Sequence, residues 1–256
     1  MGISSGPPII GIQNINKAFQ VGKNQVDVLK GVDLNIMPGE FVILFGQSGC
    51  GKSTLLNTII GLERPNSGDI IIRGRKLYDL GEDARAKVRQ DRFGIVHQQA
   101  NWIKSLNVVE NVAYPLMISG YSRRAAIKRA ERTLELLKLA EFSRYTPTEL
   151  SGGQQQKVSI CRAIINNPWI IVADEPTGNL DTVSADEVMG IFKTINEQAR
   201  RTILMVSHNP EYEKYATKVI YMKDGIIEKI VNRKDVKVDE DQYPSDLLAM
   251  ARGEVL

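Results

Sequence analysis

The sequence predicts an α/β fold with a buried parallel sheet, an N-terminal antiparallel β subdomain and an inserted α-helical subdomain. Three observations support this prediction. Short β-type segments separated by turns fill the chain as far as Gly74, and residues 83–167 have the apolar spacing of helices. After Pro168, strand-like and helix-like segments alternate again, as they do around a parallel sheet.

The N-terminal elements follow from apolar runs and turn residues. Alternating or continuous apolar residues predict strands at 10–15, 32–36 and 70–73. The apolar run at 41–45 ends directly before a glycine and is typical of a strand buried on both faces. A helix is expected soon after it, over residues 52–61.

The later elements are predicted in the same way. Ser122 is a suitable N-cap for a helix over 123–139, whose apolar residues recur at helical spacing and form a core face. A second helix follows Ser151. We then expect a strand, a helix, a strand and a closing hairpin that turns at Asp-Gly: 169–173, 183–197, 202–206 and 219–227.

These elements predict one large domain and a tail. The domain covers residues 8–230, and the helical subdomain at about 83–167 is inserted into it. Residues 231–256 are rich in charge and form a C-terminal tail, in which 245–252 is expected to be a short amphipathic helix.

Composition excludes several classes of protein. Hydrophobic residues make up 43% of the 256, enough for a sizeable core, and the net charge of +3 is too small to indicate a nucleic-acid partner. Cys50 and Cys161 form no CxxC pair, which favours a reducing compartment over a disulfide framework. No apolar run approaches the roughly 20 residues of a membrane span, and no secretory signal is apparent. Any work at a membrane would therefore need a partner.

A glycine-rich loop predicts a phosphate site. Residues 46–53 match GxxxxGK(S/T), the P-loop motif, between a predicted strand and a predicted helix. Backbone amides and a helix N-terminus would surround the phosphates, Lys52 would reach the β- and γ-phosphates, and Ser53 would ligate Mg²⁺. The predicted nucleotide-binding residues of this loop are Gly46, Gln47, Ser48, Gly49, Cys50, Gly51, Lys52, Ser53 and Thr54.

An acidic pair follows the apolar strand predicted at 169–173. Ligands of parallel-sheet enzymes bind at the carboxyl ends of strands, where Asp174 and Glu175 fall. In a chain with a P-loop, Asp174 is expected to hold Mg²⁺, and Glu175 to orient and partly deprotonate the attacking water.

A second anion site is predicted where Leu150-Ser-Gly-Gly-Gln154 opens a helix. A hydroxyl, two glycines and a helix N-terminus are again suited to a phosphate. One nucleotide does not need two such sites. We therefore expect Ser151, Gly152, Gly153 and Gln154 to serve the γ-phosphate bound to another copy of the chain.

These motifs, in this order, resemble the ABC ATPase family over nearly the whole chain, and LSGGQ is similar to its signature motif. The resemblance implies ATP and Mg²⁺ as ligands, and a homodimer or a paired ATPase subunit. Phe19 is then expected to stack on adenine, Gln98 to contact Mg²⁺ and water, Asp181 to lie in a loop that communicates across the dimer, and His208 to contact the γ-phosphate.

Two segments indicate a subgroup of this family. Residues 173–181 and 107–113 are similar to the lipoprotein-releasing, macrolide-export and cell-division ATPases. This implies a membrane-spanning permease on a separate chain, and a location at the cytoplasmic face of the membrane through that partner. His97 and Lys157 depart from the usual family residues, and neither change removes a catalytic group.

A cluster of apolar residues downstream of Gln98 suggests a groove for the partner, with Trp102 as an exposed anchor. The alternative is that these residues fill the helical subdomain's own core. The cluster consists of Trp102, Ile103, Leu106, Val109, Tyr114, Pro115 and Leu116.

Two other functions stay open at this point. A soluble ABC ATPase of the iron–sulfur assembly type has about the same size. A regulatory module that hydrolyses ATP slowly and gates a partner is also compatible with the motifs. The transported substrate is not encoded in these residues, because the partner would select it.

Overall fold

The computed structural model describes residues 6–233, which form two compact units. One unit contains residues 6–89 and 202–233, and the other contains residues 90–201. The predicted tail helix at 245–252 lies outside the described residues. Every helix that the structure describes is too short or too polar to traverse a lipid bilayer.

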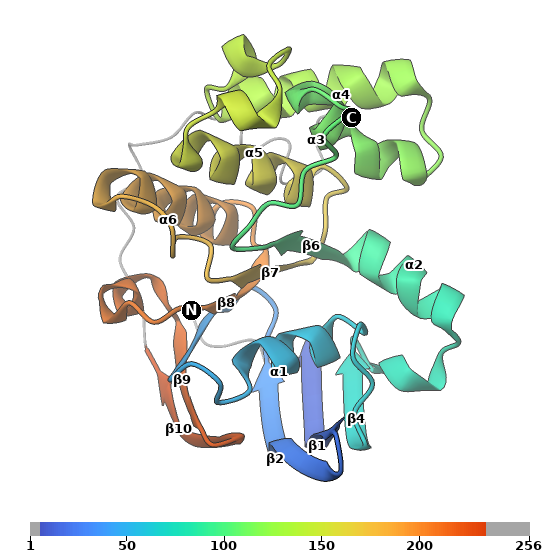
Figure 1. Ribbon diagram of the computed structural model, residues 1–256, viewed down its shortest axis with the longest axis vertical. Helices are drawn as coiled ribbons and strands as arrows, with labels where there is room; N and C mark the ends of the chain where they lie inside the picture. The colour runs from blue at the N-terminus through green and yellow to red at the C-terminus, as the bar shows by residue number, and fades with distance from the viewer. Residues whose placement is uncertain (1–5, 234–256) are drawn as a thin grey trace. The chain divides into compact units, whose positions relative to one another are not determined.

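The first unit contains the predicted antiparallel β subdomain. Four strands pair in the order β2-β1-β4-β5 (Figure 1). Ile10 lies opposite Ile36 on one side and opposite Ile72 on the other, and all three side chains are buried. The strands are β1 (Ile10–Val21), β2 (Asn24–Ile36), β4 (Ser67–Ile72) and β5 (Arg75–Lys76).

The same unit contains a mostly parallel sheet. The central strand β3 (Phe41–Gly46) pairs in parallel with β8 (Thr202–Val206) and with β9 (Lys218–Lys223). Residues 41–45 are all buried, as their apolar run predicts. β9 turns back into β10 (Ile226–Asn232) through Asp224 and Gly225, both in the left-handed region at φ 49° and 85°. The expected Asp-Gly hairpin is therefore confirmed.

Helix α1 (Lys52–Ile59) follows β3 and lies next to β2 and β3 (Figure 1). Leu55, Leu56 and Ile59 are buried, so the helix is fixed by its apolar side. Helix α2 (Glu82–Arg92) has no buried residue, and the chain passes from the first unit into the second along it.

The second unit combines helices with a parallel pair of strands, β6 (Phe93–Val96) and β7 (Ile170–Asp174). Its helices are α3 (Val108–Ile118), α4 (Arg123–Leu136), α5 (Gly152–Ile164) and α6 (Thr182–Glu197). Short 3₁₀ turns occupy Ala140–Phe142 and Pro147–Glu149 here, and Leu77–Asp79 and Pro210–Tyr215 in the first unit.

Two sequence expectations need correction. The segment predicted to be helical, at 83–167, contains the strand β6. The sequence did not reveal this strand, because a run of four residues is too short to be assigned by periodicity alone. The helix predicted over 123–139 ends at Leu136, since Lys138 adopts a left-handed φ of 58°. Its predicted start is confirmed, because Ser122 Oγ accepts the Ala125 N–H at 3.3 Å.

The first turn of α5 packs tightly on α6. A Cβ atom added to Gly153 would lie 2.7 Å from Ser184 Oγ and 2.8 Å from Ser184 Cβ. A Cβ added to the neighbouring Gly152 would meet only Leu180 Cδ2, at an ordinary 3.5 Å. Gly153 is therefore required by close packing, whereas Gly152 is not.

We predict that Gly153→Ala lowers the free energy of unfolding by about 1–3 kcal/mol, because α5 must move away from α6. Gly152→Ala is the matched control and should change it by no more than about 0.5–1 kcal/mol. Urea denaturation of both variants measures the difference. Equal midpoints would show that the two helices are not in close contact at Gly153.

Candidate functional site

The P-loop connects β3 to α1 in a backbone shape that only glycine allows. Gly49 and Gly51 have φ of 81° and 103°. A Cβ on Gly51 would lie 2.8 Å from Val28 O, and one on Gly46 would lie 2.4 Å from Met222 O. The loop is thus pressed against neighbouring backbone, and its outer residues Gln47, Ser48, Gly49 and Ser53 are exposed.

Lys52 lies within this loop. Its side chain is buried, and Nζ donates to the carbonyl oxygens of Gly46 and Gln47, both at 2.8 Å. Cys50 is also buried, and its N–H donates to Gln47 O at 3.3 Å. The ammonium group is therefore held beside the amides that a phosphate would contact.

Two further predicted residues belong to the same unit. β8 is the parallel neighbour of β3, so its following residues Ser207 and His208 lie at the same sheet edge as the P-loop. The Ser207 N–H donates to Leu44 O at 3.3 Å, and the His208 side chain is exposed. Phe19 lies on β1 and is half-buried, with Lys17 Nζ 4.7 Å from its ring centroid.

In the second unit, two parallel strands bring the other predicted groups together. β7 ends at Asp174, directly before Glu175, and β6 leads into His97 and Gln98. A Cβ on Gly178 would lie 2.9 Å from Gln98 Nε2, so Gln98 lies against the loop that follows the acidic pair. That loop is closed by a hydrogen bond from Gly178 N–H to Glu175 O at 3.1 Å.

Glu175 has a strained backbone. Its φ of 45° is in the left-handed region, which costs a non-glycine residue roughly 1–2 kcal/mol. Such strain persists only where the surrounding structure enforces it, and it is typical of functional sites. A Cβ on Gly178 would lie 3.5 Å from Glu175 Oε2, so the Glu175 carboxylate lies against the same glycine as Gln98.

The signature segment begins α5 with a complete capping box. Ser151 Oγ accepts the Gln154 N–H at 3.3 Å, and Gln154 Oε1 accepts the Ser151 N–H at 2.8 Å. Ser151 and Gly152 are exposed. Because the Ser151 oxygen acts as an acceptor in the cap, its O–H hydrogen can still be donated to an anion.

Asp181 is the N-cap of α6. Its Oδ1 accepts the Ser184 N–H at 3.0 Å and its Oδ2 accepts the Ser184 hydroxyl at 2.7 Å. These two hydrogen bonds hold the pKa of Asp181 below its usual range. Asp181 is therefore charged at neutral pH and fixes the loop that precedes it.

Three of these segments line one cavity in the second unit, which has a volume of about 320 Å³. Gln98 lines it from the segment after β6, Gly152 from the start of α5, and Asn179 and Leu180 from the loop after β7. Gln155 and Gln156, which the motifs did not single out, also line it. Gln156 Nε2 donates to His97 O at 3.3 Å and so ties α5 to the Gln98 segment.

Trp102 also lines this cavity, and the expectation that its side chain is exposed is wrong. The indole is partly buried, and its Nε1 donates to Gln155 Oε1 at 3.0 Å. The Arg162 guanidinium lies 4.7 Å from the ring centroid. Within the predicted cluster only Tyr114 is exposed, at 41%, while Val109 and Leu116 are core residues.

Buried polar contacts organise the surrounding chain. Asn111, which is fully buried, accepts the Ile103 N–H at 3.0 Å and donates to the carbonyl oxygens of Ile103, Leu106 and Asn107. The only sequence signal for Asn111 was its place in the 107–113 segment.

Burial, and then the Arg162 charge, lower the pKa of His97, which is therefore neutral at pH 7.

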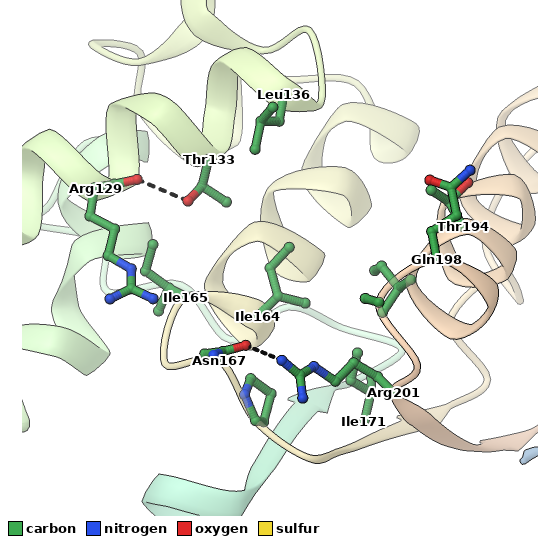
Figure 2. Close-up of a pocket in the computed structure, with 13 residues that line it drawn as sticks. Arg129, Thr133, Leu136, Ile164, Ile165, Asn167, Ile171, Thr194, Gln198 and Arg201 are labelled. Carbon is green, nitrogen blue, oxygen red and sulfur yellow. Dashed lines mark hydrogen bonds between the residues drawn. The ribbon is translucent and has the colours of Figure 1, made fainter. Parts of the chain in front are cut away.

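Another cavity of the second unit lies among α4, α5, β7 and α6 (Figure 2). Ile164 and Ile171 point into it, and Arg201 donates a hydrogen bond to Asn167 Oδ1 at its edge (Figure 2). None of the predicted site residues lines this cavity.

The predicted Mg²⁺ ligands are the Ser53 hydroxyl, the Gln98 amide and the Asp174 carboxylate. All offer the oxygen atoms that Mg²⁺ prefers. No group of three or more His, Cys, Asp or Glu residues suited to a metal ion occurs between residues 6 and 233. One carboxylate with neutral oxygens fits an ion that is bound mainly through substrate phosphates and waters.

Comparison with known proteins places these features in a family. A family model described as "ABC transporter" matches residues 29–178. The uncharacterized ABC transporter ATP-binding protein MJ0796 of Methanocaldococcus jannaschii is 42% identical over 225 residues, 86% of this chain and 96% of that protein. The macrolide export ATP-binding/permease protein MacB of Wolinella succinogenes is 41% identical over 249 residues, 97% of this chain and 38% of MacB.

Solved structures agree with this result. A dimeric MJ0796 bound to ADP and Pi, in a post-hydrolysis state, is 38% identical and has a TM-score of 0.82. The match covers 89% of this chain and all of that one. The chain therefore belongs to the ABC transporter family, and it is an ATP-hydrolysing ATP-binding cassette.

Proposed function

We propose that two copies of this chain, or one copy and a paired ATPase, close on two ATP molecules and thereby drive a separate membrane permease. The observation that supports this most directly is that two glycine-rich loops lead into helices, at Lys52 and at Ser151, and a helix N-terminus is suited to an anion. Each ATP would lie between the P-loop of one chain and the Ser151 segment of the other. The dimeric MJ0796 cassette provides a precedent.

Lys52 and Ser53 would bind the phosphates and their ion. Lys52 Nζ would exchange its carbonyl contacts for the β- and γ-phosphate oxygens, which form stronger, charge-assisted hydrogen bonds. Ser53, Gln98 and Asp174 would hold Mg²⁺, directly or through water. When bound, Mg²⁺ would neutralise charge on the phosphates.

Glu175, Gln98 and His208 would handle the attacking water and the γ-phosphate. Glu175 would accept a proton as the water oxygen attacks the γ-phosphorus, and the bond from that phosphorus to the ADP oxygen breaks. His208 would donate to a γ-phosphate oxygen. Gln98 would orient the water, which is consistent with its position against the Glu175–Gly178 turn.

The partner is proposed to be a permease on a separate chain, which would hold this subunit at the cytoplasmic face of the membrane. The name of MacB, which combines an ATP-binding protein with a permease, supports a partner of this kind. Exposed side chains on α3 and in the turn after it offer a contact surface: Tyr114 at 41%, Ile118 at 62% and Tyr121 at 48%. Copurification with a multispan membrane protein tests this proposal, and copurification with soluble scaffold proteins alone would contradict it.

We predict that Glu175→Gln lowers the ATPase rate by about 10²–10⁴-fold, because the amide cannot accept the proton from water. ATP binding should persist, and the ATP-bound dimer should accumulate. Phosphate release and size-exclusion chromatography with ATP measure the two effects. Glu131→Gln, an exposed carboxylate on α4, is the control and should behave as the wild type. Hydrolysis by Glu175→Gln at the parental rate would refute the role given to Glu175.

The shared site predicts complementation between two inactive variants. Lys52→Ala removes the P-loop cation, and Ser151→Asp retains a good helix cap while it places a negative charge opposite the phosphate. A mixed dimer has one site with both wild-type segments, so an equal mixture should recover up to about a quarter of the wild-type rate. A mixture that stays as inactive as its components would contradict a site built from two chains.

A further inference from the structure

Lys17 contacts the residue expected to stack on the adenine base. It lies two positions before Phe19 on β1, and its Nζ is over the Phe19 ring, 4.7 Å from the centroid. Although it is a lysine, its side chain is only 11% exposed. A cation of this kind is usually solvated, so its burial against an aromatic ring calls for a specific explanation.

Lys17 is also held in place by the loop that follows α1. Its Nζ is 2.5 Å from Glu63 Oε1 and donates to Arg64 O at 2.8 Å. A further hydrogen bond joins β1 to this loop next to Lys17, since the Ala18 N–H donates to Asn66 Oδ1 at 2.7 Å. The position of Phe19 is therefore coupled to the loop that follows α1.

This coupling would link the protein segments expected to contact the base and the phosphates of a nucleotide. The phosphates would lie at the N-terminus of α1, and the loop containing Glu63 and Arg64 leaves its C-terminus. Phe19 has no hydroxyl group, so no hydrogen bond of its own can fix the orientation of its ring. Lys17, with three directed contacts, supplies that constraint.

We propose that Lys17 is a positioning residue for the nucleotide base: it holds one face of Phe19 and leaves the other face for adenine. This rests on the proposed stacking role of Phe19. The ammonium draws the π electrons of the ring towards itself, so the opposite face becomes less negative. An electron-rich purine is then repelled less and stacks more favourably on that face.

The alternative is a purely structural role, in which Lys17 fixes the 63–66 loop and the base is irrelevant. The two roles differ in one measurable respect. A positioning role affects ligands that contain the base, whereas a structural role affects every ligand of the P-loop equally. Tripolyphosphate has the phosphates of ATP without the base, and it therefore separates the two.

The test is calorimetric binding of ATP and of tripolyphosphate to the full-length chain. Lys17→Met should weaken ATP binding by about three- to tenfold and leave tripolyphosphate binding unchanged. Lys17→Arg retains the cation and should keep most of the affinity for ATP. Lys23→Met, an exposed lysine in the turn of the same hairpin, is the matched control and should bind both ligands as the wild type does.

A double substitution completes the design. In a Phe19→Leu background, where the ring is absent, Lys17→Met should cause no further loss of ATP affinity. Equal losses for ATP and tripolyphosphate, or a loss that persists in Phe19→Leu, would overturn the proposal and indicate the structural role. Failure of the wild type to bind ATP would instead refute the proposed function itself.

Discussion

Phosphate binding by backbone amides is the constraint on which the site depends. An anion can be surrounded by N–H groups only if the backbone approaches it closely, and side chains would prevent that approach. Gly46 and Gly51 meet this demand while pressed against Met222 and Val28 on their other side. The loop thus has contacts on its inner side and an exposed outer side, and Lys52 is held between them.

The remaining groups depend on a second geometric rule, that parallel strands present their following loops at one edge of the sheet. In one unit this rule places His208 beside the P-loop, since β8 is the neighbour of β3. In the other it places Gln98 beside the turn after β7. The left-handed backbone at Glu175 belongs to that turn. Strand pairing therefore brings together residues that are far apart in the sequence.

Much of this could be predicted from the sequence, because the signals are local. The P-loop, the capped start of α5 and the Asp-Gly hairpin are each specified by a few adjacent residues. The strand β6 was missed because four apolar residues carry no period, and only its pairing with β7 defines it. Whether Trp102 is exposed depends on Gln155 and Arg162, more than 50 positions away, which no local pattern reveals. The Lys17 contact with Glu63 is non-local in the same way.

The cap of α5 gives a physical reason why the second anion site should depend on a partner. The first four N–H groups of a helix have no partner within the helix, and the Ser151 hydroxyl already accepts one of them, from Gln154. What remains for an anion is the Ser151 O–H and the first amides, with no lysine within the motif to add charge. Such a site attracts a phosphate only weakly compared with the P-loop, where Lys52 supplements the amides. A γ-phosphate already held by one P-loop would overcome this weakness, because the second chain then binds an anion whose position and charge are fixed. ATP, and not the protein surface alone, would thus determine when two chains associate.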